Sequence, residues 1–180
     1  MQFYLISDKT MIMNLPDISG KNKILLIGNI ATGKTHLARK LQQRYQLPLL
    51  HVDQIQFDQR LQITPHQKTI QLIHEFQSQA SWIIDGHGPL DILIESFTKA
   101  DCIIFLDPPI AKIYLFLSWR WFKIFCGKNR AELPVGHNER NWFHFKKSFQ
   151  TVEKIHRIMR PQIIKILAKD DLKNKVIHIV

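Results

Sequence analysis

The chain has 180 residues and a mass of 21.2 kDa, which is the size of a single domain. Hydrophobic residues make up 45% and charged residues 22%, a composition that supports a packed core and excludes a wholly disordered chain. The net charge of +10 lies entirely in residues 111–180, which hold 15 basic and 5 acidic groups, whereas residues 1–110 are balanced. This asymmetry predicts a polyanionic partner: nucleotide phosphates, nucleic acid or an acidic surface.

Several classes of protein are excluded by simple patterns. The two cysteines, Cys102 and Cys126, form no C-x-x-C pair, so neither a disulfide framework nor a cysteine zinc site is expected. The most apolar stretch, residues 110–126, contains three basic residues, so we expect no spanning helix and no membrane partner. The amino terminus lacks the basic start of a signal peptide, and a cytoplasmic location is predicted.

The first part of the chain differs from the remainder. Residues 1–20 hold three of the four methionines, and we interpret residues 1–22 as a loosely attached extension with a short edge strand within residues 3–6. No linker or repeat divides the rest, so residues 23–180 are predicted to form one domain.

Within that domain, short apolar runs alternate with longer amphipathic segments. The short runs predict five buried strands, at residues 23–27, 49–52, 81–84, 102–106 and 176–180. Strands that alternate with helices predict an α/β fold of three layers, in which helices cover both faces of a five-stranded, mostly parallel sheet.

Helices are predicted between these strands from periodicity and start signals. They fall at residues 34–45, 64–79, 110–126 and 141–169. For the second of them, Thr64, Pro65 and Gln67 predict a capped start. In the last, Pro161 is expected to kink or split the helix. Residues 127–140 carry glycine, proline and charge and are predicted to form a loop.

The strongest functional signal follows the first of these strands. Residues 28–35 satisfy the phosphate-loop pattern G-x-x-x-x-G-K-[ST], and they lie between a predicted strand and a predicted helix, the context that the motif requires. Backbone N–H groups in such a loop bind phosphate oxygens, and the helix N-terminus adds a favourable partial charge. Lys34 suits the β- and γ-phosphates of ATP, and the Thr35 hydroxyl suits Mg²⁺. All eight positions are candidate nucleotide-binding residues: Gly28, Asn29, Ile30, Ala31, Thr32, Gly33, Lys34 and Thr35.

Two aspartates end neighbouring strands in this prediction. Asp53 follows the second strand, and its carboxylate could hold Mg²⁺ or accept the proton of a substrate hydroxyl; a turn or N-cap aspartate is the alternative. Asp85 ends the third strand, where a carboxylate beside a phosphate loop suits Mg²⁺; here too a structural role is the alternative. His51 is expected to pack, and Asp107 to cap the helix that follows it.

The segments LLIGNIATGKTHLARKL, LLHVDQIQF, WIIDGHG and CIIFLDPP resemble those of the adenylate-kinase-like nucleoside-monophosphate kinase superfamily. Within it, the chain is most similar to the small bacterial DNA-topology-modulation or FlaR-type kinases. The resemblance covers about residues 23–180 and implies a P-loop NTPase fold with a short lid near residues 127–140. No N-K-x-D guanine signature is present, which argues against a GTPase.

The resemblance also implies roles for particular residues. Asp53 would face the acceptor substrate, and Asp85 would position Mg²⁺ or the acceptor. Arg120 lies near the place where relatives contact the donor nucleotide. Arg130 and Arg140 would belong to the lid, which closes over the transferring phosphoryl group and excludes water; for each, a solvated surface arginine is the alternative.

The chain departs from these relatives at the acceptor site. Adenylate kinases follow the D-G pair with F-P-R, whose arginine binds the acceptor monophosphate, whereas this chain has Gly86-His87-Gly88. The acceptor therefore stays unidentified. Basic residues of the last long helix are expected to form a solvated face, and the aromatic cluster is expected to be mainly core packing: Trp119, Trp121, Phe122 and Phe125.

These patterns predict a Mg-ATP-dependent phosphotransferase that moves the γ-phosphoryl group of ATP to a small-molecule or nucleotide acceptor. Lys34, Asp53, Asp85 and Arg130 are the candidate catalytic residues, and Thr35, Asp53 and Asp85 the candidate metal ligands. The alternative is a P-loop ATP-binding regulatory protein that contacts DNA through its basic second part.

Overall fold

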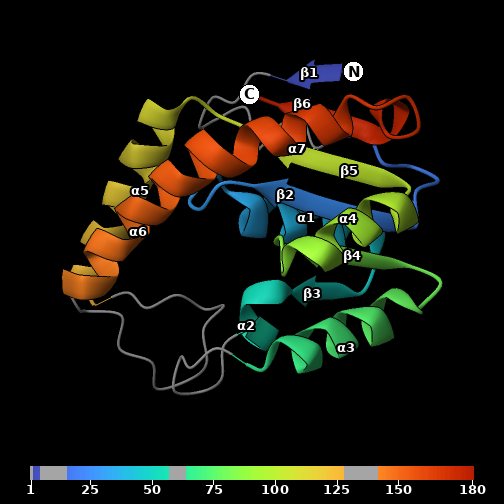
Figure 1. Ribbon diagram of the computed structural model, residues 1–180, viewed down its shortest axis with the longest axis horizontal. Coiled ribbons are helices and arrows are strands. Elements are labelled where there is room, and N and C mark those ends of the chain that lie inside the picture. Colours follow the sequence, from blue (N-terminus) through green and yellow to red (C-terminus); the bar gives the residue numbers. More distant parts are fainter. Residues whose placement is uncertain (1, 5–15, 57–63, 128–141) are drawn as a thin grey trace.

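The computed structural model describes residues 2–4, 16–56, 64–127 and 142–180. Its centre is a parallel sheet of six strands in the order β1-β6-β5-β2-β4-β3, which is shown in Figure 1. The strands are β1 (Gln2–Tyr4), β2 (Lys23–Gly28), β3 (Leu49–His51), β4 (Trp82–Asp85), β5 (Cys102–Leu106) and β6 (Val176–Ile179). The predicted five-stranded parallel sheet is thus confirmed, and β1 adds a short sixth strand beside β6.

The helices are α1 (Lys34–Tyr45), α2 (Val52–Gln56), α3 (His66–Gln77), α4 (Leu90–Lys99), α5 (Ile110–Phe125), α6 (Trp142–Lys154) and α7 (Arg160–Leu167). A π-helical turn, Ile155–Met159, joins α6 to α7, and a short 3₁₀ turn, Lys173–Lys175, precedes β6. None of the helices in the described ranges has the length and hydropathy needed to cross a bilayer.

Alternate residues of the central strand bury against opposite layers. Leu25 and Ile27 of β2 belong to a cluster with α4 and α7, where Phe97 and Leu167 are fully or nearly buried. The other face of β2 packs on α1 in a second buried cluster. Its members include Ile24, Leu26, Leu37, Ala38 and Leu41. The predicted three-layer arrangement follows from this alternation (Figure 1).

Part of the predicted extension packs on this core. Ile18 is 1% exposed and belongs to the cluster on the α1 side, and its backbone N–H lies 3.4 Å from the Tyr45 hydroxyl. The division into residues 1–22 and 23–180 stays a prediction, as does a lid at residues 127–140, of which nearly all lies outside the described residues.

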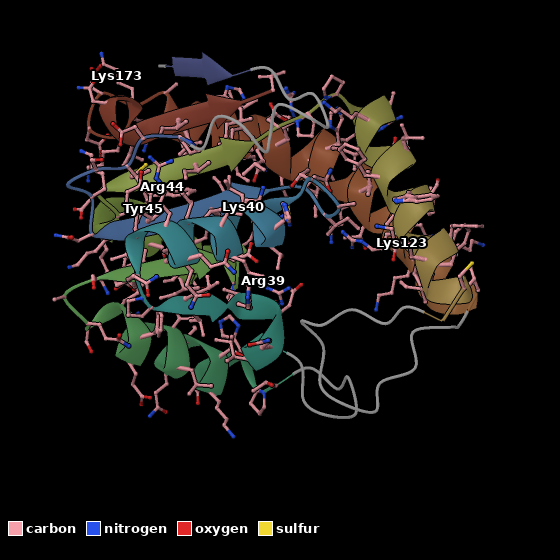
Figure 2. The ribbon with its side chains drawn as sticks, turned by 180° about the vertical axis from the view of Figure 1, so that it is seen from behind. Arg39, Lys40, Arg44, Tyr45, Lys123 and Lys173 are labelled. Carbon is pink, nitrogen blue, oxygen red and sulfur yellow. The ribbon has the colours of Figure 1, made fainter. Side chains whose placement is uncertain are left out.

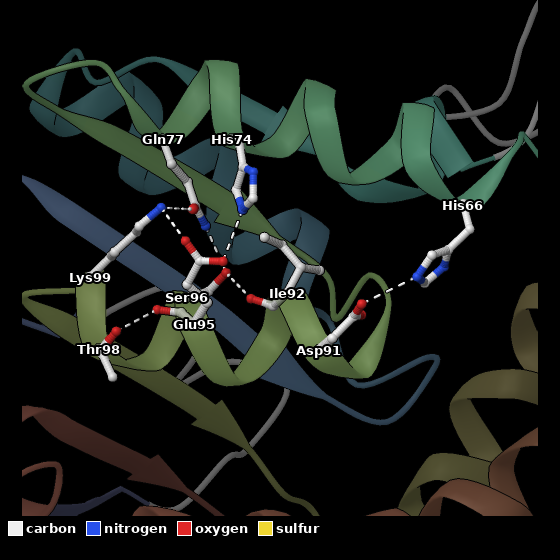
Figure 3. Close-up of polar contacts among 9 residues, drawn as sticks. All are labelled: His66, His74, Gln77, Asp91, Ile92, Glu95, Ser96, Thr98 and Lys99. Atoms are coloured by element: carbon white, nitrogen blue, oxygen red, sulfur yellow. Dashed lines mark hydrogen bonds and ion pairs between the residues drawn. The ribbon is translucent and has the colours of Figure 1, made fainter.

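Two helices that the sequence pattern missed, α2 and α4, complete the layers. Figure 3 shows how α4 is joined to α3. Buried Gln77 donates to the Ser96 hydroxyl at 2.6 Å, and Ser96 donates in turn to the Ile92 carbonyl at 2.7 Å. Lys99 donates to the side-chain oxygen Oε1 of Gln77 at 3.1 Å. Each buried polar group in this chain of contacts has a partner, as a stable interior requires.

The predicted capped start of α3 is wrong. Pro65 has the extended backbone angles φ −49° and ψ 133° and is itself the N-cap residue, without a side-chain capping bond. The Thr64 backbone N–H instead donates to the Gln56 carbonyl at 3.0 Å. The helix therefore begins one residue later than predicted, at His66.

Pro161 interrupts the last long helix, as predicted. The helix continues from α6 to α7, but five residues before Arg160 adopt π-helical geometry. Proline lacks the N–H for the bond one turn back and its ring collides with that turn, and a π-bulge is one way to absorb the conflict.

Candidate functional site

The phosphate loop connects β2 to α1 at the carboxyl edge of the sheet. Its backbone turns at Gly28, with φ 146°, and again at Ala31 and Gly33, with φ 58° and 89°. A Cβ at position 28 would lie 2.2 Å from the Leu106 carbonyl oxygen of β5, so only glycine fits there. Ala31 holds a left-handed angle that is uncommon for a residue with a Cβ. Such departures from ordinary backbone geometry are concentrated at ligand sites.

Asn29 organises the interior of the loop. Its side-chain oxygen accepts the Ile30 N–H at 2.8 Å, and its amide donates to the Val152 carbonyl of α6 at 3.0 Å. Its own carbonyl accepts the Thr32 hydroxyl at 2.9 Å and the Lys34 ammonium at 2.5 Å. The Lys34 charge is therefore held inside the curve of the loop, where a phosphate group would sit.

Asp85, at the end of β4, lies directly beside the start of α1. Thr35 donates its hydroxyl proton to Asp85 Oδ2 at 2.7 Å, and His51 Nδ1 lies 3.0 Å from the same oxygen. Burial would raise the pKa of Asp85, but the His51 hydrogen bond, the Lys34 charge and the Thr35 hydroxyl together hold it below its ordinary value. The carboxylate is thus ionised at neutral pH.

The second oxygen of Asp85 is the group that fits a metal ion. Asp85 Oδ1 is buried and has no hydrogen-bond partner within the described ranges, which is costly for a carboxylate unless a cation or water occupies the space. In the part of the chain that the structure describes, no three or more His, Cys, Asp or Glu side chains are placed so that they could hold a metal ion by themselves. A site for Mg²⁺ does not need such a cluster, because in phosphotransferases Mg²⁺ binds to one or two protein oxygens and to the phosphates of the substrate.

Asp53 lies near this position in the fold. It is exposed in the first turn of α2, two residues beyond His51, which pairs in register with Asp85. Its neighbour Val52 is buried and packs closely on Gly86: a Cβ added to Gly86 would lie 3.1 Å from the Val52 Cβ. Asp53 is therefore exposed beside the strand ends, next to a buried neighbour.

The remaining predicted site residues are more widely spread. Arg120 is partly buried on α5. Arg130 and Arg140 lie outside the described residues. His87, in the segment that lacks the acceptor-binding arginine of adenylate kinases, follows β4. Burial and the Lys34 charge lower its pKa to about 3 against the opposing effect of Asp85. Its imidazole is accordingly neutral at neutral pH.

A small cavity opens beside the phosphate loop. It has a volume of about 10 Å³, room for about one water molecule, and its lining includes Gly28, Asn29, His87, His156 and Arg160. The Nε2 of His87 and the Nδ1 of His156 are both buried without a hydrogen-bond partner in the described structure. Two ring nitrogens and a guanidinium thus adjoin the loop, although neither His156 nor Arg160 was predicted to belong to the site.

Asp107 does not cap α5, contrary to the prediction. The N-cap residue of α5 is Pro109, and the buried Asp107 carboxylate accepts two hydrogen bonds from Arg160, at 2.6 and 2.8 Å. His178 Nε2 of β6 lies 3.1 Å from it. Arg160, expected on a solvated face, is thus held at the end of β5 by a two-pronged ion pair.

His51 is the other residue whose role sequence reasoning missed. It was expected only to pack, yet its ring contacts the Asp85 carboxylate beside the phosphate loop. The available signal was register: the first two strand ends after the phosphate loop carry His51 and Asp85, and adjacent parallel strands bring such ends together.

Comparisons with known proteins concern the fold that carries this site. The model of the ATPase family associated with various cellular activities (AAA) matches residues 24–108, from β2 to just beyond β5. No curated protein matches the chain. Among solved structures, shikimate kinase from Acinetobacter baumannii in complex with shikimate aligns with a TM-score of 0.53 and 16% identity, covering 89% of this chain and 83% of that one.

Shikimate kinase from Bacteroides thetaiotaomicron aligns with a TM-score of 0.51 and 16% identity, covering 89% of this chain and 86% of that one. At this level of identity the likeness concerns the fold. The chain therefore has the α/β fold of P-loop kinases, with an all-parallel sheet and its phosphate loop at the carboxyl edge.

Proposed function

We propose that this chain is a Mg-ATP-dependent phosphotransferase that acts on a small-molecule or nucleotide acceptor. The observation that carries the proposal is the contact between the Thr35 hydroxyl and Asp85, 2.7 Å apart, with Lys34 held in the same loop. A strand–loop–helix connection without a nucleotide role requires neither this carboxylate nor this lysine. The finer similarity to FlaR-type kinases stays a prediction.

The loop residues would hold the nucleotide. Backbone N–H groups of Asn29 and residues 31–33 would bind the phosphates, and Lys34 would exchange its bond to the Asn29 carbonyl for bonds to phosphate oxygens. Thr35 and the free oxygen of Asp85 would hold Mg²⁺, which when bound neutralises charge on the β- and γ-phosphates. Asp85 must stay ionised for this, and its low pKa supports that state.

Transfer would occur at the open side of the strand ends. An acceptor hydroxyl oxygen forms a bond to the γ-phosphorus as the bond from that phosphorus to the β,γ-bridging oxygen breaks, and ADP leaves. Asp53, exposed at the start of α2, is the proposed acceptor of the hydroxyl proton. Arg120, and the predicted lid arginines Arg130 and Arg140, are proposed to contact the phosphates.

The test measures nucleotide binding and turnover in matched lysine variants. ATP with Mg²⁺ at about 100 times its Kd should stabilise the protein by about 2.7 kcal/mol, a melting shift of roughly 5–10 °C for a chain of this size. ADP release is then measured against a panel of nucleosides, nucleotides and small metabolites. Lys34→Ala should lower that turnover by at least ~100-fold.

Lys40→Ala is the control, because it removes the same charge from the same helix about 9 Å further along its axis. Asp85→Asn should mimic Lys34→Ala in turnover and abolish the dependence of ATP binding on Mg²⁺. Turnover that survives in Lys34→Ala, or that falls equally in Lys40→Ala, would contradict the assignment.

A further inference from the structure

Helix α5 carries an exposed apolar surface that the phosphate site does not use. The residues Leu115, Trp119, Phe122 and Phe125 are 66%, 57%, 57% and 47% exposed, and we call them the α5 stripe. The predicted core role of the aromatic cluster is therefore correct for Trp121, which is 3% exposed, and wrong for its three neighbours. Large apolar side chains gathered on one exposed face indicate an interaction surface.

Helical geometry places three residues of the stripe on one ridge. At 100° per residue, Leu115, Trp119 and Phe122 fall within roughly 60° of arc along about 10 Å of the helix. Phe125 lies roughly 60° further round, beside Trp121, with ring centroids 5.9 Å apart. The opposite face of α5 is already covered: Ile113, Leu117, Trp121 and Ile124 are buried in a cluster with Val152 of α6. Figure 1 shows α5 and α6 side by side, extending beyond the edge of the sheet.

Basic residues border this ridge, and acidic residues are absent from the helix. The Lys123 ammonium lies 5.4 Å from the centroid of the Trp119 ring, and Lys112 lies 5.9 Å from that of Phe116. Figure 2 shows Lys123 on the α5 arm, away from the labelled basic residues of α1. Lysines of this kind rest their apolar stems on aromatic rings and direct their charge to the boundary.

We propose that the α5 stripe docks on a bilayer surface that contains anionic lipids. A helix with exposed tryptophan, phenylalanine and leucine on one side and flanking lysines has the composition of an interfacial helix, whose apolar side chains enter the headgroup region. The net charge of +10 in residues 111–180 adds long-range attraction to such a surface. The expectation of no membrane partner considered only a spanning segment, and this contact does not span.

Charge and shape decide between this surface and other occupants. A second copy docked antiparallel through the same ridge would bring Lys112 of one copy near Lys123 of the other, with no carboxylate on α5 to compensate. Single-stranded nucleic acid stacks its bases in positively charged grooves, whereas this ridge is convex and Trp119 and Phe122 already stack on each other, with ring centroids 5.4 Å apart. An anionic bilayer, which is flat and has an apolar interior below its headgroups, fits both the lysines and the convex shape of the ridge.

The experiment is co-sedimentation of the full chain with phosphatidylcholine vesicles, with and without phosphatidylglycerol. Binding should require the anionic lipid and should weaken strongly at about 0.5 M salt, where the Debye length is only a few ångströms. Trp119→Ala with Phe122→Ala should reduce the vesicle partition coefficient at least ~10-fold. Lys112→Gln with Lys123→Gln should reduce it by about 5-fold for each charge removed.

Two controls separate surface docking from loss of fold. Leu90→Ala with Ile94→Ala removes comparably exposed apolar side chains, 52% and 47% exposed, from α4 and should leave vesicle binding unchanged. Trp119→Phe keeps an apolar ring, so it should keep binding but lose the blue shift of fluorescence that Trp119 gives on entering the interface. All these variants should keep ATP-induced stabilisation, and Lys34→Ala should keep vesicle binding, so the test is independent of the proposed function.

Three results would overturn the proposal. The first is the absence of anionic-vesicle binding, or binding that the Trp119 and Phe122 double variant leaves intact. The second is a wild-type dimer in sedimentation equilibrium that this double variant converts to monomer, which would assign the stripe to self-association. The third is single-stranded DNA binding that the double variant abolishes while vesicles do not bind.

Discussion

The close approach of β2 to β5 makes position 28 the most demanding in the phosphate loop. Gly28 has φ 146°, and a Cβ there would lie 2.2 Å from the Leu106 carbonyl oxygen and 3.1 Å from its carbonyl carbon. Gly28 and Leu106 are also paired in register in the sheet. Gly28→Ala must therefore separate two central strands by about 1 Å or distort the loop, since no side chain can move aside to relieve the contact.

The expected cost has two parts that a control can separate. A left-handed backbone angle costs a residue with a Cβ roughly 1–2 kcal/mol, and overpacking a close-packed interior adds roughly 1–3 kcal/mol. Gly20→Ala is the control: Gly20 has φ 76° but nothing within 4 Å of its added Cβ, so only the first cost applies. We expect Gly28→Ala to lose about 2–5 kcal/mol and Gly20→Ala about 1–2 kcal/mol.

Urea unfolding monitored by circular dichroism measures both losses. For a domain of this length each kcal/mol also lowers the melting temperature by roughly 2–4 °C, so thermal melts give an independent check. Gly28→Ala should in addition weaken ATP binding, because the loop that holds the phosphates cannot keep its geometry. A Gly28→Ala protein within about 1 kcal/mol of Gly20→Ala would refute the argument from the Leu106 contact.

Two further predictions concern buried ionisable groups. Asp107→Asn removes the charge that binds Arg160 and His178, and because Arg160 is 36% exposed and can turn partly to water, the unfolding free energy should fall by about 1–3 kcal/mol; an unchanged urea midpoint would contradict the ion pair. Since the pKa of His87 is about 3 in the folded protein and 6.5 unfolded, the unfolded chain binds the extra proton between these values and stability falls as pH drops through that window. At about pH 4.5 this loss of unfolding free energy should reach roughly 2–3 kcal/mol. It should be absent in His87→Gln but kept in the control His66→Gln, whose imidazole is exposed. Equal acid sensitivity of the two variants would contradict the prediction.

The parts of the fold that were predictable depend on local patterns. The boundaries of α1 and β5 match the predictions because a buried strand and an amphipathic helix have their own periodicities. The phosphate loop was identified because its residues are contiguous. Helix α4 was missed because it follows a segment of glycine, histidine and proline, which resembles an extended loop. Its polar contacts with α3, between Gln77 and Ser96 and between His74 and Glu95, join residues about 20 positions apart in the sequence.

The predictions that were wrong share a different cause: they depend on contacts between residues that are far apart in the sequence. Asp107 was interpreted from its neighbours, but its partner Arg160 lies 53 residues away. Likewise, no local pattern distinguishes Trp119 from Trp121 on an apolar helix, because the face that α6 covers decides which one is buried. Burial of a helix that is apolar on all sides therefore cannot be derived from its own composition.

The same reasoning explains how the phosphate loop keeps its form. The motif specifies residues 28, 33, 34 and 35 and leaves position 29 open, yet the Asn29 side chain joins the loop to α6 through the Val152 carbonyl, 123 residues later. Its oxygen and its backbone carbonyl also bind Ile30, Thr32 and Lys34. A loop held at this many points is ordered before any ligand arrives, which lowers the entropy lost on binding. In this chain the glycines permit the loop conformation, whereas Asn29, at a position that the motif leaves open, and its contact with α6 determine it.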